Sequence, residues 1–108
     1  MTNEDKNLKI CDALRWTEIK KKTLINLFPS GIHPKTGEFD LLPNHFTDLN
    51  ACHEALLSQC DPQFIEEFEA NLWSVMGNVG WLTTASASQF AEAFGLTRGL
   101  WTKEDSHA

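Results

Sequence analysis

The spacing of apolar and polar residues predicts a chain built mainly from helices. Over residues 3–14, apolar residues recur near helical spacing behind Asn3, a residue type that commonly caps helices. Residues 48–60 and 62–76 show the same periodicity and follow each other almost without a loop. They therefore predict two helices that pack as an antiparallel helical hairpin.

Each hairpin helix has a recognisable start. Thr47 can cap the first, and the carboxylate of Asp48 suits the positive end of the helix dipole. Asp61 followed by Pro62 marks the start of the second, because proline is favoured at the first helical position. The residues expected to face the core are Leu49, Cys52, Leu56 and Cys60 in the first helix and Phe64, Phe68, Leu72, Val75 and Met76 in the second.

The C-terminal part predicts a further helix and a return of the chain to the core. The helix begins near Ser86 or Ser88 and follows the sequence SASQFAEAFGL. After the helix, Leu100 and Trp101 bring apolar side chains back to the body of the protein.

Three further segments are less regular. Residues 15–28 suit either a short helix opened by Thr17 or an irregular strand, and we interpret them as helix. Residues 29–45 hold three of the four prolines and predict a long loop or loose hairpin that could form a binding edge. Residues 77–84 begin with Gly77, include Gly80 and favour one short strand.

Together these elements predict one small α+β domain dominated by helices. The helical hairpin and the N- and C-terminal helices would surround a very small sheet or a single short strand. A length of 108 residues suits one domain over 1–108, with ends that fray at about 1–4 and 102–108. The apolar runs are far shorter than the roughly 20 residues that span a bilayer. Because the N-terminus also lacks the apolar core of a secretory signal, we expect a cytoplasmic protein.

Composition narrows the range of partners. The formal net charge is -6, which argues against direct nucleic-acid binding because that requires clustered Lys and Arg. A basic protein surface is a more compatible partner. The three cysteines are an odd number in a chain without an export signal, so they indicate reduced thiols rather than a disulfide framework.

The residue patterns offer little support for catalysis or metal binding. Four residues of the types that bind zinc lie close together in the sequence, namely His45, Cys52, His53 and Cys60. Their spacing fits no standard zinc site, and the adjacent Cys52 and His53 point in different directions on a helix. Glu66 and Glu67 are expected on an exposed face, without the desolvating pocket that a general acid needs. The sequence therefore predicts neither an enzyme nor a bound metal or cofactor.

An interaction surface is the remaining functional candidate. The chain has four tryptophans and no tyrosine, and tryptophan is common both in cores and at the centres of protein interfaces. One or two exposed tryptophans would anchor a partner. The residues expected on this surface are His45, Asn50, His53, Glu54, Glu66, Glu67, Glu69, Trp16 and Trp81.

Two stretches between Leu42 and Trp101 resemble a known family. The first, LLPNHFTDLNACHEAL, is similar to the signature LP-x-(Y/F)-x-x-DLNA-x-(H/W)-E, and TTASASQFAEAFGLTRGLW is similar to the ending A-T-A-x-Q-x-AEAFL-x-x-x-GLW. Both belong to small bacteriophage proteins grouped as the phage ABA sandwich family, which usually has an aliphatic residue at the position of Gly95. The resemblance implies a phage or prophage origin, a small α/β or α+β domain and no established enzymatic activity.

Three functions are compatible with these features. The first is a phage accessory protein that binds and inhibits a host factor, such as a defence nuclease complex, in the bacterial cytoplasm. The second is sequestration of a nucleotide signal, with the 29–45 segment closing on Trp16 or Trp81 near the helix start at Asp48. The third is a structural part of the virion or a replication accessory. A homodimer would be one way to complete a core of this modest size.

Overall fold

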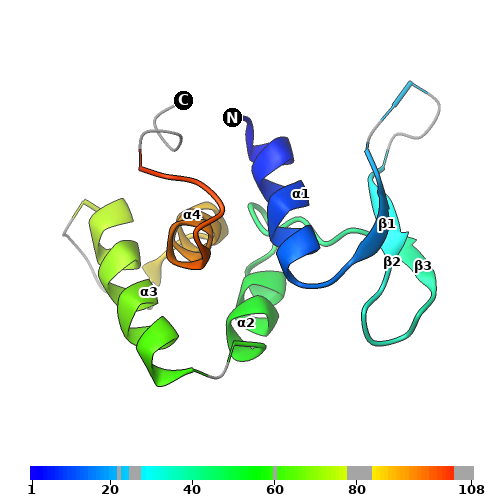
Figure 1. Cartoon of the computed structure of the whole chain (residues 1–108). Helices are drawn as coiled ribbons and strands as arrows, with labels where there is room; N and C mark the ends of the chain where they lie inside the picture. Colours follow the sequence, from blue (N-terminus) through cyan, green and yellow to red (C-terminus); the bar gives the residue numbers. More distant parts are fainter. Residues whose placement is uncertain (22, 25–27, 60, 78–83, 104–108) are drawn as a thin grey trace.

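The computed structural model describes residues 1–21, 23–24, 28–59, 61–77 and 84–103. These residues form four helices and a small three-stranded antiparallel sheet, which confirms a helix-dominated α+β fold (Figure 1). The elements in chain order are α1 (Asn3–Ala13), β1 (Thr17–Lys20), β2 (Ser30–Ile32), β3 (Phe39–Leu41), α2 (Leu49–Leu57), α3 (Pro62–Val75) and α4 (Ala87–Arg98). No helix among the described residues is long and apolar enough to cross a membrane.

The helix starts follow capping chemistry, with two shifts from the sequence prediction. Helix α1 is capped by Thr2 rather than Asn3, because the Thr2 side chain accepts the backbone N–H of Asp5. Helix α2 is capped by Asp48 rather than Thr47, because the Asp48 carboxylate accepts the N–H groups of residues 50 and 51. The predicted cap of α3 by Asp61, with Pro62 at the first helical position, is confirmed.

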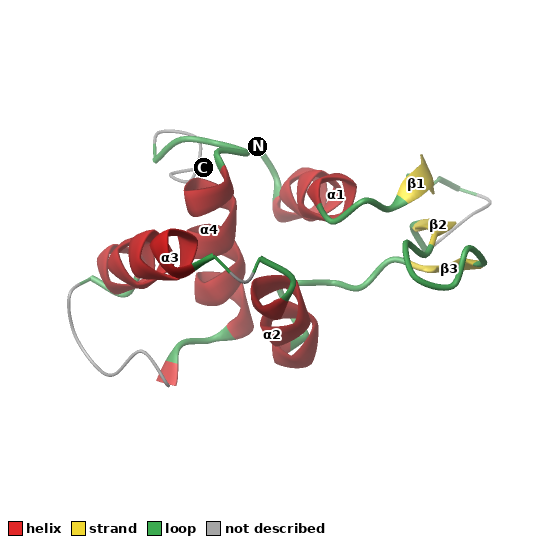
Figure 2. Cartoon of the chain, turned by 60° about the horizontal axis from the view of Figure 1, so that its bottom comes forward, coloured by secondary structure: helices red, strands yellow, loops and turns green. Residues whose placement is uncertain are grey.

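Helix α4 is the centre of the helical body, and α3 packs along it more extensively than any other helix does. The Phe68 ring of α3 lies 4.7 Å from the Phe90 ring of α4, and Phe64 meets Phe94 edge-on at 5.7 Å. Figures 1 and 2 show α2 and α3 splayed on either side of α4. The expected packing of the 48–60 and 62–76 helices mainly on each other was therefore wrong, since each has α4 as its principal partner.

The residues predicted to face the core from α3 do so, whereas one residue predicted to face the core from α2 is exposed. Phe68 and Leu72 are buried, and Phe64, Val75 and Met76 pack against the same core. In α2, Cys52 and Ala55 enter the core, but Leu49 is 40% exposed. Leu49 is the first residue of the helix, where the chain has only just reached the body, so its side chain has little to pack against.

Gly95 allows the chain after α4 to fold back onto the helix. A Cβ atom at Gly95 would lie 1.9 Å from the indole ring of Trp101, so the ring occupies the space that any larger residue would need. Trp101 is buried, and Gly99 in the left-handed conformation ends α4 before it. The predicted return of Trp101 to the body is therefore confirmed.

The sheet lies at one end of the molecule, where α1 is the helix that packs on it, through β1 (Figures 1 and 2). The interpretation of residues 15–28 as helix was wrong, because Thr17–Lys20 forms strand β1 and pairs with β2. The register shifts within β1, where Glu18 takes a positive φ of 48°, as in a β-bulge. Of the two alternatives predicted for residues 29–45, the hairpin is confirmed, because β2 and β3 pair and Gly31 lies opposite Asp40. The strand expected at 77–84 lies largely outside the described residues.

Candidate functional site

A buried asparagine on α1 holds the segment that links the sheet to α2. The Asn7 amide donates from Nδ2 to the Pro43 carbonyl at 2.9 Å. Its Oδ1 accepts the backbone N–H of His45 at 2.9 Å and contacts the His45 ring Nδ1 at 2.8 Å. Residues 43–45 therefore form a fixed structural joint, in which the Asn7 side chain satisfies the Pro43 carbonyl and the His45 N–H.

His45 belongs to this joint and not to an exposed surface. Its side chain is only 2% exposed, so the expectation that it faces outward was wrong. Because an amide oxygen can only accept, the ring Nδ1 must carry the proton that it shares with Asn7. Burial lowers the pKa of His45 to about 4, an effect that the nearby negative charge of Asp48 partly opposes. A neutral imidazole is therefore a structural part of the fold near neutral pH.

The two described cysteines are buried and have the properties of inert thiols. The Cys52 Sγ donates to the His45 carbonyl at 2.8 Å, and Cys11 is fully buried in α1. Burial raises the pKa of both thiols to about 12, so neither forms the thiolate that a nucleophile or metal ligand requires. Within the described part of the chain, no group of three or more His, Cys, Asp or Glu residues could hold a metal ion. Cys60, the fourth member of the suspected zinc set, lies outside that part.

A groove of about 880 Å³ runs between the sheet and the helical body. Its walls come from the end of α1, the β2–β3 hairpin, the 43–45 joint, α2 and the end of α4. It brings together three residues that the sequence analysis named separately, namely Trp16, His45 and Glu54. Trp16 is only 7% exposed and packs against the His33 ring at 4.9 Å. The expectation of Trp16 as an exposed anchor was therefore wrong, because its indole holds the hairpin against α1.

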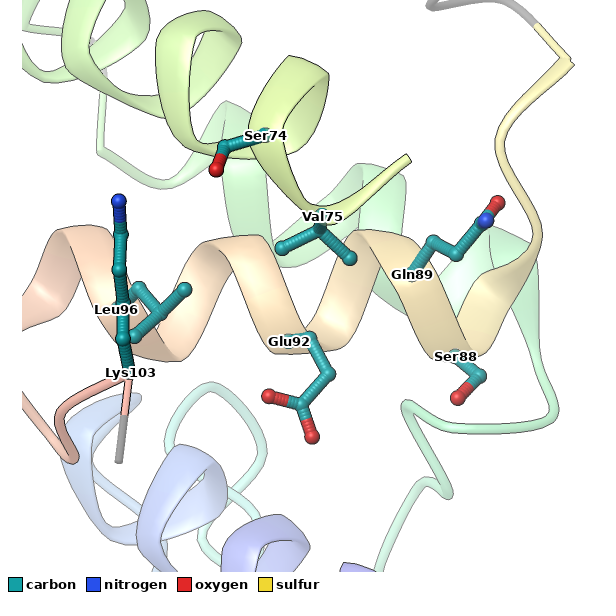
Figure 3. Close-up of a pocket in the computed structure, with 7 residues that line it drawn as sticks. All are labelled: Ser74, Val75, Ser88, Gln89, Glu92, Leu96 and Lys103. Carbon is teal, nitrogen blue, oxygen red and sulfur yellow. The ribbon is translucent and has the colours of Figure 1, made fainter. Parts of the chain in front are cut away.

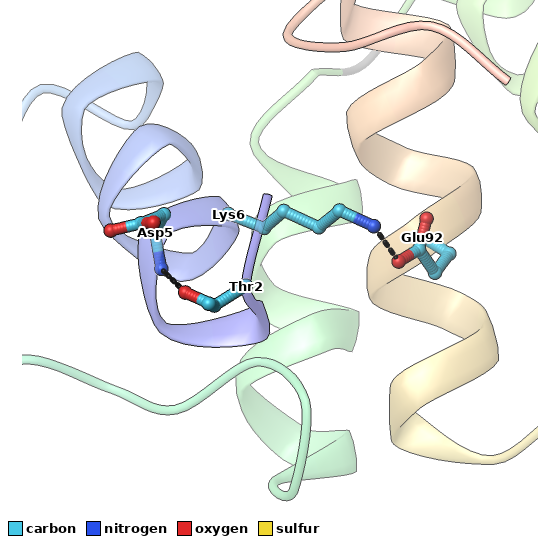
Figure 4. Close-up of polar contacts among 4 residues, drawn as sticks. All are labelled: Thr2, Asp5, Lys6 and Glu92. Atoms are coloured by element: carbon cyan, nitrogen blue, oxygen red, sulfur yellow. Dashed lines mark hydrogen bonds and ion pairs between the residues drawn. The ribbon is translucent and has the colours of Figure 1, made fainter. Parts of the chain in front are cut away.

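A buried ion pair connects α1 to α4 beside a second cavity. In Figure 4 the Lys6 side chain reaches from α1 to Glu92 on α4, and the ammonium group also lies 5.3 Å from the centre of the Trp101 ring. Glu92 accepts this contact through Oε1, whereas Oε2 is buried and accepts no hydrogen bond from a described residue. Because removing one partner of a buried pair leaves an uncompensated charge, this contact fixes the position of α1 on α4.

Glu92 also lines a cavity of about 410 Å³ between α3, α4 and Lys103 (Figure 3). Val75 and Leu96 supply its apolar part, and Ser74, Ser88 and Gln89 supply neutral polar groups. In Figure 3 Glu92 turns away from Val75 toward α1. The carboxylate of Glu92 in this cavity is already paired with Lys6. The cavity is therefore a poor candidate for a site of acid–base chemistry.

The outer face of α3 carries the residues that the sequence analysis placed on an exposed surface. Glu66, Glu67 and Glu69 are all exposed, as predicted. Trp73 is 41% exposed and follows Glu69 by four residues and Glu66 by seven, so these three side chains share one face of the helix. The sequence analysis did not assign Trp73 to this surface, although its position out of phase with Phe68 and Leu72 would have indicated it.

Three of the remaining candidate residues lie on α2, and the fourth lies outside the described part of the chain. Asn50 is exposed on α2, and His53 is exposed while its ring stacks on Phe90 at 5.3 Å. Glu54 is exposed and faces the groove. Trp81 lies outside the described residues. The nine residues therefore do not form one surface: Asn50, His53 and Glu54 share one exposed face of α2, and Glu66 and Glu69 share one exposed face of α3.

The chain matches no protein-family model, no curated protein and no solved structure. The resemblance to the phage ABA sandwich family therefore remains a prediction, and the arguments for function rest on the residues themselves.

Proposed function

We propose that the protein acts by non-covalent binding, through the outer face of α3, to a basic surface of another protein. We call this face the α3 surface and define it as Glu66, Glu69 and Trp73. The half-exposed Trp73 beside two carboxylates is the observation that carries the proposal. It combines an apolar anchor with charges that would steer a basic partner toward it.

Physical arguments support a protein rather than a nucleic acid as the partner. Tryptophan is enriched among the residues that dominate the free energy of binding, because it buries a large area at small conformational cost. The two carboxylates beside this anchor would repel a phosphate backbone and attract Lys and Arg side chains. The chain as a whole carries a formal charge of -6, which adds to the same long-range attraction.

A basic surface that normally meets DNA is one such partner. We propose that the protein is a phage or prophage accessory protein that occupies such a surface on a host factor, for example a defence nuclease complex, in the bacterial cytoplasm. The phage origin rests on the sequence resemblance, and the inhibitory role rests on the acidic charge of the α3 surface.

Capture from host lysate tests this proposal. The tagged protein should retain a host protein at low salt and release it as salt rises, because screening weakens contacts between exposed charges. Trp73→Ala should reduce retention at least about tenfold, since truncating an interface anchor typically costs 2 kcal/mol or more. Duplex DNA added to the complex should compete with the protein for its partner.

The matched control is Glu38→Lys on the hairpin, compared with Glu66→Lys on the α3 surface. Both substitutions change the charge by the same amount at an exposed position. Only Glu66→Lys should reduce retention, while both variants keep the melting temperature of the wild type. Equal retention by the wild type, Trp73→Ala and Glu66→Lys would show that the α3 surface is not the binding face.

A further inference from the structure

The groove between the sheet and the helical body carries three basic side chains, Arg15, Lys35 and Arg98. We propose that this groove binds a small organic anion, a phosphate or carboxylate attached to an apolar group. The site is separate from the α3 surface, so neither proposal depends on the other.

The three cations come from three different parts of the fold. Arg15 follows α1, Lys35 lies in the β2–β3 turn and Arg98 is the last residue of α4. All three are exposed, and none forms an ion pair with a described residue. The fold therefore gathers three positive charges around one groove in a chain that is acidic overall.

Two carboxylates also line the groove and limit its net charge. Asp40 accepts the backbone N–H of Leu41 through Oδ1 at 2.8 Å, and Glu54 lies on the α2 wall. Three cations against two carboxylates leave a formal charge of +1, compared with -6 for the whole chain. This balance suits a ligand with one anionic group better than a polyanion.

The backbone of Arg15 supports a role beyond charge. Arg15 has a φ of 73°, in the left-handed region that glycine usually occupies after a helix. Its N–H donates to the Asp12 carbonyl and that of Trp16 donates to the Cys11 carbonyl, which is the Schellman pattern. An arginine here is conformationally strained, and the observed strain calls for a functional reason.

The hairpin wall adds a neutral donor. The His33 Nδ1 accepts the backbone N–H of Lys35 at 3.0 Å. In the neutral ring, the proton must then reside on Nε2. An imidazole N–H donor that lines the same groove as Lys35 is suited to hold an anionic oxygen.

The groove also offers apolar contacts at its two edges. Leu41 on the sheet side is 58% exposed, and Leu57 on the α2 side is 72% exposed. The volume of about 880 Å³ lies within the usual range of small-molecule sites. A guanidinium group can donate two parallel hydrogen bonds to a carboxylate or a phosphate, so these two anion types define the ligand class.

Titration of the ¹⁵N-labelled full chain with two matched probes tests the proposal. Phenyl phosphate and phenylacetate share an apolar ring and differ in the anionic group, whereas benzyl alcohol has a similar ring and no charge. Saturable amide shifts at residues 15, 33, 35 and 98 with either anion, and none with benzyl alcohol, support the site. The probe that binds with the higher affinity shows whether the groove prefers a phosphate or a carboxylate.

Variants then establish which charges act. Arg98→Gln and Lys35→Gln should each weaken binding of the better probe about tenfold, as expected for loss of a charge-assisted hydrogen bond. Lys21→Gln changes the charge equally at an exposed residue that does not line the groove, and should leave binding within about twofold. Equal weakening by Lys21→Gln would indicate only nonspecific attraction and would overturn the proposal.

Arg15 gives a second, independent readout. Arg15→Gly should raise the melting temperature by about 4 °C or more, because glycine relieves the left-handed strain, and should weaken anion binding. Arg15→Ala removes the same charge but keeps the strain, so it should weaken binding without raising the melting temperature. Undiminished binding by both variants would contradict the role of Arg15.

Two results would overturn the proposal as a whole. One is the absence of saturable shifts with both aromatic anions up to about 10 mM, a concentration at which even weak fragment binding is detectable. The other is saturable binding of a Glu-rich peptide with no binding of either small anion, which would assign the groove to an acidic protein segment.

Discussion

At the scale of single residues, Gly95 and His45 show how closely the interior is specified. Gly95 lies in the middle of α4, where glycine is normally unfavourable, because the Trp101 ring occupies the position of its missing side chain. His45 is a titratable residue that the fold keeps neutral by burying it against Asn7. Both residues lie in the two stretches that resemble the phage family, and both have structural roles.

Gly95→Ala should destabilise the protein by about 1–3 kcal/mol, the usual cost of forcing extra atoms into a packed core. The better helix propensity of alanine works in the opposite direction and is outweighed by the contact of 1.9 Å with the indole. Denaturant unfolding measures the difference. In the Trp101→Leu background the same substitution should cost much less, and an equal cost in both backgrounds would show that the indole is not the cause.

His45 should make the protein less stable as the pH falls. Burial lowers the folded-state pKa of His45 from 6.5 to about 4. Between these values the unfolded chain binds a proton that the folded chain does not, so stability decreases from about pH 6.5 toward pH 4, by up to about 3 kcal/mol. Unfolding free energies of the wild type and His45→Gln, measured across this range, should differ in slope. Equal slopes for the two proteins would contradict this prediction.

At the scale of elements, local signals and long-range contacts contribute differently. The ends of α3 and α4 follow capping rules, and the outer and inner faces of α3 follow helical periodicity. Strand β1 has no such local determinant, because its four residues become a strand only by pairing with β2 about ten residues later. The sequence of β1 was therefore also compatible with a helix. In the same way, local patterns located α2 and α3 individually but did not indicate that each packs mainly on α4.

The start of α4 provides a matched pair of serines. Ser86 forms a capping box in which its side chain accepts the N–H of Gln89 and the Gln89 side chain accepts the N–H of Ser86. Ser86→Ala should cost about 1 kcal/mol of stability. Ser88 lies inside the helix, so Ser88→Ala should lower the stability by less than half as much. Thermal or chemical unfolding measures both losses. The reverse order would place the cap at Ser88.

At the scale of the whole molecule, the helices form one body around α4 and the sheet extends from one end. The chain measures 41 × 30 × 22 Å along its principal axes, which is elongated for its size. The Asn7 joint, the Trp16–His33 contact and the Lys6–Glu92 pair connect parts of the chain that lie far apart in sequence. These contacts position the groove, whereas the packing of Phe64 and Phe68 on α4 positions the α3 surface.

The rates at which the buried thiols react show whether the helical body unfolds as a unit. In a Cys60→Ser background, Cys11 and Cys52 should resist an aromatic disulfide reagent under native conditions, since burial raises the pKa of each thiol to about 12. Both should react at one common rate, set by global opening, because each lies in the packed interior. Fast reaction of Cys11 alone would indicate that α1 opens separately from the helical body.

The sequence by itself determined the fold class, the α3 helix with its two faces, and the acidic character of the chain. These properties depend on periodicity, capping and composition, which act over a few residues or over the chain as a sum. Only the tertiary structure decided that His45 and Trp16 are buried, that α4 is the shared partner of α2 and α3, and that Arg15, Lys35 and Arg98 meet at one groove. Such outcomes depend on contacts between distant segments, and local sequence patterns do not specify them.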